Sequence, residues 1–174
     1  GSFPAPAPEP AAMLVFAADH GVVEEGVSAY PQAVTAAMVA NMVSGGAAIS
    51  VLARRFAIDL LLVDVGVACD LAIADDGNSE TMFRGAKIGR GTRNLRLEPA
   101  MSNAERDAAI AVGRAAADEA IQAGAQVIAL GEMGIGNTTP AAALVCAMTG
   151  ADPESVTGRG TGIDDSTHAR KVRV

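Results

Sequence analysis

The segment GEMGIGNTTP, residues 131–140, limits the possible folds of this chain more than any other. An apolar run, 127–130, leads into it, and an alanine-rich apolar run, 141–148, follows it. This order predicts a strand, a glycine turn and a helix. The glycines allow the backbone to approach a ligand closely, the polar residues 137–139 are typical of a helix start, and Pro140 suits the first helical turn. The free N–H groups of such a helix start attract anions.

Strand and helix patterns alternate along the rest of the chain. The apolar runs 13–18 and 58–67 predict buried parallel strands. Predicted helices begin at Pro31, Ala47, Ser102 (with Glu105 as a capping box) and Asp152, and Gly45-Gly46 and Gly124 interrupt or end them. Helical periodicity predicts a set of inward-facing residues: Val34, Met38, Met42, Ile49, Leu52, Ile110, Ala117 and Ile121. The alternation predicts an α/β fold, with a parallel sheet and helices on both faces.

Composition and charge exclude several classes of function. A net charge of -7 argues against broad nucleic-acid binding, and no apolar run approaches the length of a membrane span. Cys69 and Cys146 stand in apolar sequence without metal-site or CxxC spacing, which predicts reduced core residues and a cytoplasmic location. We expect residues 1–12 to be a cloning scar and a flexible Pro/Ala tail, and residues 13–174 to form part of one α/β domain.

Polar residues follow two of the predicted strands. Asp19-His20-Gly21 ends the first strand, and Asp64 lies near the end of the second. Open α/β sheets bind ligands at the carboxyl ends of their strands, so Asp19, His20 and Asp64 are candidates to support a pocket. The alternative is that Asp19 caps a turn and that His20 is a satisfied structural histidine. The basic segment 83–92 is interpreted as solvated arginines, with a phosphate contact as the alternative.

Several segments together resemble one enzyme family. They are FAADHGVVEEGVSAYPQAVT (16–35), MVANMVSGGAAISVLAR (38–54), VDVGV (63–67), GEMGIGNTTPAAAL (131–144) and GRGTGIDD (158–165). From about Met13 to the last residue, the chain is similar to the nicotinate-nucleotide–dimethylbenzimidazole phosphoribosyltransferases. The resemblance implies a Rossmann-like large domain, a homodimer, and catalysis without a metal or cofactor.

The resemblance also implies a glycosyltransferase reaction in cobalamin lower-ligand assembly. Nicotinate mononucleotide gives its phosphoribosyl group to a nitrogen of 5,6-dimethylbenzimidazole or a related base, nicotinate leaves, and α-ribazole 5′-phosphate forms. Members of the family are longer, and their general-base glutamate lies in a carboxyl-terminal part. We therefore expect this chain to be a fragment that lacks that residue.

The resemblance and the needs of the chemistry together predict the site residues. Binding a phosphate requires N–H groups and a cation, for which the candidates are Gly134, Gly136, Asn137, Thr138, Gly160, Thr161 and Lys171. Glu132 is predicted to steady the cationic sugar, to orient a ring or to act as a substitute base; the alternative is a carboxylate bonded to N–H groups of the turn. The predicted base pocket consists of Ser28, Tyr30, Gln32, Gly46 and Met133, unless their loop lies at the dimer interface.

Two other functions stay open. Without the general base, the chain is a fragment that binds nucleotide or dimerises without turnover. The weaker alternative is a nucleotide-binding α/β oxidoreductase, because residues 131–136 give GxxGxG, which reverses the dinucleotide-binding order of glycines.

Overall fold

The structure, a computed structural model, describes residues 10–73 and 81–174. Most of the predicted tail and all of the polar segment 75–80, whose composition is typical of a loop, lie outside the described residues. The first strand begins at Ala11, so the last part of the expected tail belongs to the sheet instead.

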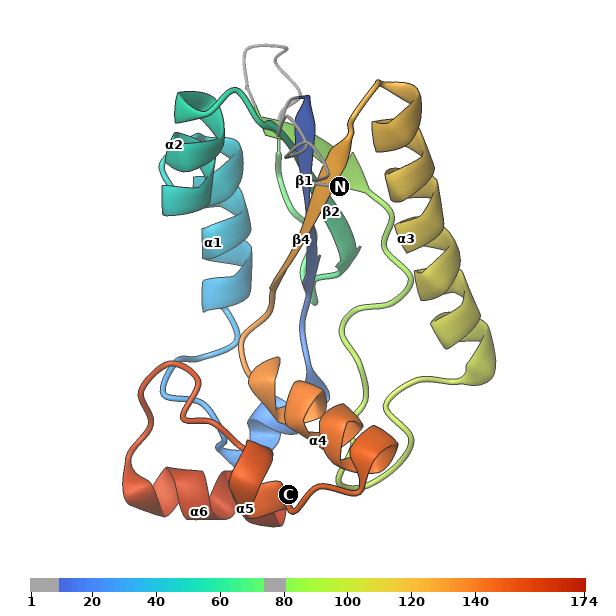
Figure 1. Cartoon of the computed structure of the whole chain (residues 1–174). Helices are drawn as coiled ribbons and strands as arrows, with labels where there is room; N and C mark the ends of the chain where they lie inside the picture. Colours follow the sequence, from blue (N-terminus) through green and yellow to red (C-terminus); the bar gives the residue numbers. More distant parts are fainter. Residues whose placement is uncertain (1–9, 74–80) are drawn as a thin grey trace, which may run out of the picture.

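The described residues form one parallel sheet with the order β3-β2-β1-β4. Its strands are β1 (Ala11–Ala18), β2 (Asp59–Gly66), β3 (Thr81–Gly85) and β4 (Val127–Met133). The predicted parallel α/β sheet is confirmed. The chain runs outward from β1 to β3 and then returns to place β4 on the other side of β1 (Figure 1), so the order reverses between β1 and β4.

Helices cover both faces of the sheet, as predicted. The helical elements are η1 (Gly21–Glu25, a 3₁₀ helix), α1 (Val34–Val43), α2 (Ala48–Arg55), α3 (Asn103–Gln122), α4 (Thr138–Thr149), α5 (Pro153–Val156) and α6 (Asp165–Arg173). Figure 1 shows α1 and α2 on one face, α3 on the other, and α4, α5 and α6 beyond the carboxyl ends of the strands.

Alternating strand residues supply two core layers, because successive side chains of a strand point to opposite faces. Val15 and Leu62 pack with Val39 of α1 on one face. Leu14 and Leu61 pack with the α3 face that contains Ala116 on the other. Small and aliphatic residues fill both layers, which lets the helices approach the sheet closely.

The prediction of inward-facing residues is wrong at several positions. Leu52, Ile110 and Ile121 are 55%, 50% and 58% exposed, whereas Ala53 and Ala116 of the same helices are buried. Helical period identifies a stripe of residues, but which stripe meets the sheet depends on how closely the helix can approach. Cys69 is exposed, not a core residue.

The segment Val34–Arg55 is long and apolar enough to cross a membrane by length and composition, with a hydropathy of 1.6. This corrects the expectation that no apolar run approaches that length. In the structure the segment is two helices, α1 and α2, and Gly45 between them has a φ of +80°. Val39 and Ala53 pack in the core layer, so the fold accounts for the apolar character of both helices.

Asp64 organises the end of β2. Its Oδ1 accepts hydrogen bonds from the N–H groups of Gly66 (3.1 Å) and Val67 (2.8 Å). Its Oδ2 lies 2.9 Å from Nζ of Lys87, and the residue is 3% exposed. The contacts of this carboxylate therefore secure the strand end and the segment that follows β3.

We expect Asp64→Ala to lower the free energy of unfolding by about 3 kcal/mol, because it removes the buried carboxylate that pairs with the Lys87 ammonium and leaves two N–H groups without their acceptor. Urea unfolding followed by circular dichroism measures the change. Asp59→Ala, at the exposed start of β2, is the matched control and should stay within about 0.5 kcal/mol of the unaltered chain. Equal stability of the two variants would contradict this role of Asp64.

Candidate active site

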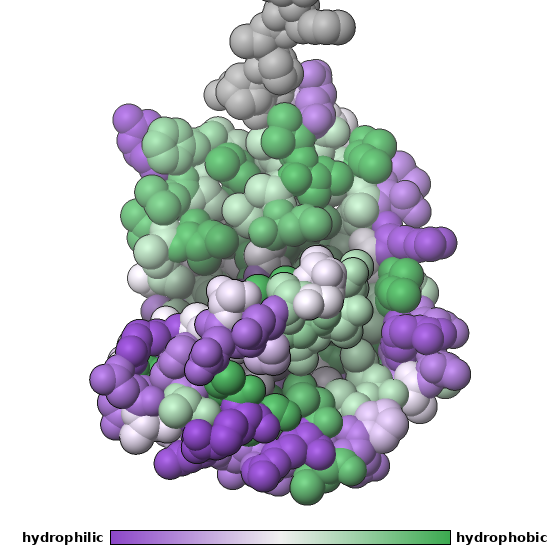
Figure 2. All heavy atoms as spheres, turned by 60° about the horizontal axis from the view of Figure 1, so that its bottom comes forward, coloured by the Kyte–Doolittle hydropathy of each residue, from purple (hydrophilic) through white to green (hydrophobic). Residues whose placement is uncertain are grey.

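A cleft lies at the carboxyl ends of β1 and β4, where the strand order reverses. Open α/β sheets bind ligands at this position. The cleft has a volume of about 400 Å³, and its lining includes His20, Glu132, Met133, Asn137 and Thr138. Figure 2 turns this end of the molecule toward the reader and shows hydrophobic side chains above a rim of hydrophilic ones.

The predicted strand, glycine turn and helix are confirmed, and the turn packs tightly on its neighbours. A Cβ on Gly134 would overlap the Ala18 carbonyl oxygen and would lie 2.9 Å from Nε2 of His20. Gly136 has a φ of +82°, and a Cβ there would lie 2.6 Å from Val23. The glycines therefore allow the end of β4 to lie against β1 and η1.

Glu132 lies in β4, one residue before the strand ends, and not in the turn as predicted. Its Oε2 accepts a hydrogen bond from Nδ2 of Asn137. The side chain is exposed at the cleft, yet the protein around it displaces enough water to raise the pKa of the Glu132 carboxyl. Asn137 occupies the N-cap position of α4 without a capping side-chain bond, which corrects its predicted capping role: it orients Glu132 instead.

Lys171 joins the two glycine loops. Its Nζ donates to Oγ1 of Thr138 (2.7 Å) and to the carbonyl oxygen of Gly158 (2.9 Å). A Cβ on Gly160 would lie 2.9 Å from Oγ1 of Thr138 and 3.6 Å from Nζ. The structure thus brings Thr138, Gly160 and Lys171 together, while Thr161 is exposed beside them.

Lys171 is 4% exposed, so it is not a surface lysine. Burial lowers the pKa of its ammonium group. An ammonium has three N–H donors, and within the described part of the chain two of them have acceptors. Lys171 also borders a cavity of about 540 Å³ on the other side of α4, together with Thr139, whose buried Oγ1 has no partner among the described residues.

His20 and Asp19 follow β1 with different roles. His20 is half-buried and lines the cleft. Burial lowers the pKa of its imidazole, and the charge of Asp19 opposes that shift in part. Asp19 is buried, and its Oδ2 accepts a hydrogen bond from the Ala68 N–H (2.8 Å), so it ties the end of β1 to the residues after β2.

The sequence did not predict one wall of the cleft. Thr92, Leu95, Ala100 and Met101 line it, from the segment before α3. The Thr92 N–H donates to the Asp19 carbonyl oxygen and the Gly21 N–H donates to that of Thr92, both at 3.0 Å. The signal in the sequence was Gly91, whose φ of +83° permits this close approach. The basic residues of 83–92 instead favoured the prediction of a solvated segment.

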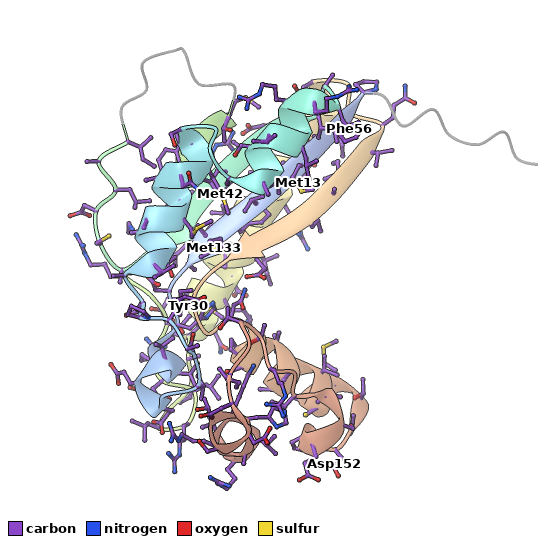
Figure 3. All side chains as sticks on the ribbon, turned by 90° about the vertical axis from the view of Figure 1, so that its left-hand side faces the viewer. Met13, Tyr30, Met42, Phe56, Met133 and Asp152 are labelled. Carbon is purple, nitrogen blue, oxygen red and sulfur yellow. The ribbon has the colours of Figure 1, made fainter. Side chains whose placement is uncertain are left out.

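The cleft lining does not include Ser28, Tyr30 or Gln32 of the predicted base pocket. Oγ of Ser28 accepts a hydrogen bond from the Tyr30 N–H (3.2 Å), and Tyr30 is 51% exposed. Figure 3 places Tyr30 and Met133 at the same end of the sheet. The Ile135 N–H also donates to Oγ1 of Thr35 (3.0 Å), which ties the start of α1 to the β4–α4 turn. The role of Ser28, Tyr30 and Gln32 in a base pocket stays a prediction.

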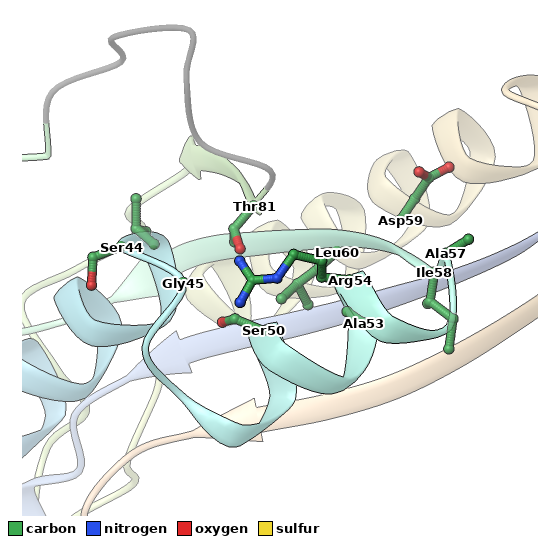
Figure 4. A pocket seen from close by; sticks show the side chains of 11 residues that line it. Ser44, Gly45, Ser50, Ala53, Arg54, Ala57, Ile58, Asp59, Leu60 and Thr81 are labelled. Atoms are coloured by element: carbon green, nitrogen blue, oxygen red, sulfur yellow. The ribbon is translucent and has the colours of Figure 1, made fainter.

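Gly46 does not belong with the other predicted base-pocket residues. Helix α1 runs back along the sheet from the carboxyl ends to the amino ends of the strands (Figure 1), so the residues after it lie at the end opposite the cleft. A separate cavity of about 480 Å³ at that end is lined by Gly45, Ser50, Arg54 and Thr81 (Figure 4). The hydroxyls of Ser50 and Thr81 both donate to the Met42 carbonyl oxygen (2.8 and 3.2 Å), so they serve the fold.

The chain is similar to known proteins over nearly its whole length. A family model described as phosphoribosyltransferase matches residues 2–174. The nicotinate-nucleotide–dimethylbenzimidazole phosphoribosyltransferase of Salinispora tropica is 46% identical, covering 100% of this chain and 50% of the relative. The enzyme of the same name from Chromobacterium violaceum is 54% identical over 93% of this chain and 45% of the relative. The chain thus spans about half the length of the curated relatives it matches.

A solved structure shows the same fold. The crystal structure of CobT from Thermus thermophilus superposes with a TM-score of 0.87 and 47% sequence identity, over 94% of this chain and 47% of that one. The family model covers nearly the whole chain, and the fold matches that of a relative. The chain belongs to the phosphoribosyltransferase family that includes the nicotinate-nucleotide–dimethylbenzimidazole phosphoribosyltransferases.

Proposed function

We propose that this chain acts in the transfer of the phosphoribosyl group of nicotinate mononucleotide to 5,6-dimethylbenzimidazole, a step of cobalamin lower-ligand assembly. The observation that carries the proposal is the pair of side chains held by the first residues of α4: Asn137 bonds Glu132, and Thr138 bonds Lys171. The Glu132 carboxylate therefore lines the cleft at the switch point of the sheet, and the Lys171 ammonium bonds Thr138 in the wall of that cleft. A phosphorylated sugar needs a cation to bind its phosphate and an anion to stabilise the positive charge that develops on its reacting carbon.

Each group has a place in the reaction. Lys171, Thr138 and the N-terminus of α4 hold the 5′-phosphate. The bond between the anomeric carbon and the nicotinate nitrogen breaks, and nicotinate leaves with that electron pair. A nitrogen of the base forms the new bond and the base loses a proton. Glu132, oriented by Asn137, stabilises the positive charge on the sugar and accepts the proton when no other base does so.

A second candidate function rests on the length of the chain. The relatives are about double its length by the shares quoted above, and the resemblance places the general-base glutamate of the family outside it. The alternative is a nucleotide-binding part that turns over only with further polypeptide. Homodimerisation and a cytoplasmic location, both expected from the sequence, belong to the proposal for the whole enzyme.

The test is the release of nicotinate by this chain from nicotinate mononucleotide, with and without 5,6-dimethylbenzimidazole. We expect release that depends on the base, with an equal amount of α-ribazole 5′-phosphate, measured by chromatography. Binding of the nucleotide without release would overturn turnover by this chain and support the nucleotide-binding alternative. Absence of binding, measured by calorimetry, would overturn both.

We expect Glu132→Gln to lower base-dependent release of nicotinate by about 100-fold, because the amide neither accepts a proton nor balances the charge on the sugar. The dissociation constant of nicotinate mononucleotide should change little, since the phosphate contacts are intact. Glu154→Gln, an exposed change of the same charge on α5, is the control. Release at the unaltered rate by Glu132→Gln would remove Glu132 from the mechanism.

We expect Lys171→Ala to raise the dissociation constant of nicotinate mononucleotide by about tenfold, because a charge-assisted hydrogen bond to the phosphate is lost. The affinity for nicotinate riboside, which has no phosphate, should not change. Arg173→Ala removes the same charge from an exposed position of α6 and serves as control. Equal weakening of both ligands by Lys171→Ala would place the lysine outside the phosphate site.

A further inference from the structure

The His20 ring is a polar group of the cleft that forms no hydrogen bond with residues 10–73 or 81–174. It lines the cleft together with Asn137 and Thr138. Within the described part of the chain, neither ring nitrogen has a hydrogen-bond partner, although the residue is half-buried. A polar group that is partly removed from water without a partner costs free energy. A bound ligand that supplies the partner recovers that cost.

The ring is held in place by its surroundings. The backbone of His20 forms a parallel bridge with Thr92. The Nε2–Cδ2 edge of the ring lies against Gly134, whose Cβ would be 2.9 and 3.1 Å from these two atoms. The opposite edge of the ring carries Nδ1. A side chain that packing holds in one orientation loses little entropy when it binds a ligand.

Burial and one charged neighbour act on the His20 ring in opposite directions. Asp19 precedes it and favours the imidazolium form, but burial has the larger effect and lowers the pKa of the imidazole. Neutral imidazole has one N–H donor and one acceptor nitrogen. A hydroxyl group, which both donates and accepts, matches it. A carboxylate is a poorer match, because Glu132 borders the same cleft and repels it.

The position of the His20 ring relative to Lys171 indicates which part of a phosphorylated ligand would contact the ring. Lys171 bonds Thr138, and Thr138 and His20 line the same cleft on either side of the β4–α4 turn. A phosphate held at Lys171 therefore directs the group attached to it along the turn toward His20. We propose that His20 is a substrate-binding residue that hydrogen-bonds a hydroxyl of the phosphoribosyl group. This inference rests on the proposed function and adds a sugar contact to it.

The experiment compares two ligands that share a phosphate: ribose 5-phosphate and inorganic phosphate. His20→Ala, and His20→Leu of similar volume, remove both nitrogens. We expect each to raise the dissociation constant of ribose 5-phosphate by about tenfold and to leave that of inorganic phosphate within about twofold. Calorimetry measures both constants, and circular dichroism confirms that the variants fold.

Conservative variants separate hydrogen bonding from packing. His20→Asn places an amide near the position of Nδ1, and His20→Gln places one near Nε2. On our proposal at least one of them binds ribose 5-phosphate within about threefold of the unaltered chain. If both bind it as weakly as His20→Leu, or if all variants weaken the two ligands equally, the ring acts only through packing and the proposal is overturned.

The outcome also separates this inference from the proposed function. If the unaltered chain binds both ligands and His20→Ala binds ribose 5-phosphate equally well, only the assignment of His20 fails. If the unaltered chain binds neither ligand, the phosphoribosyl site itself is refuted and both proposals fall.

Discussion

The close contact between Gly134 and the end of β1 is the constraint on which the rest of the site depends. Any side chain at this position would overlap the Ala18 carbonyl oxygen, so only a glycine lets β4 end beside β1. The hydrogen bond from the Ile135 N–H to Thr35 then ties the same turn to α1. With the turn held on both sides, Glu132 before it and the start of α4 after it have one possible placement.

The parts of the fold that local sequence determines could be predicted. The strand that precedes Gly134 and the capping box of Ser102 and Glu105 are examples, because an apolar run or a pair of side chains three residues apart contains the whole signal. The inward faces of the helices could not. Leu52 is exposed because the small Ala53 lets α2 lie closer to the sheet, and this choice depends on residues distant in sequence.

In the candidate site, too, residues within local motifs could be predicted and residues placed by distant contacts could not. The glycine turn, Lys171 and Glu132 could be found from their motifs. The wall that contains Thr92 could not, because it is built by hydrogen bonds to Gly21, 71 residues earlier in the chain. The distance of Gly46 from the cleft could not be predicted for a related reason: the glycine pair marks where α1 ends, but only the path of α1 along the sheet decides at which end of the strands it lies.

Asn137 and Thr138, at the N-terminus of α4, also hold two ionisable side chains of the site. Burial shifts the pKa of Lys171 down and that of Glu132 up, which disfavours the charged form of each group. Asn137 and Thr138, adjacent in sequence, orient these two groups at the positive end of the helix dipole. In the proposed function, the phosphate of the nucleotide stabilises the charged form of Lys171, and the cationic sugar stabilises the charged form of Glu132. In that proposal, each part of the ligand favours the charged form of the side chain that binds it.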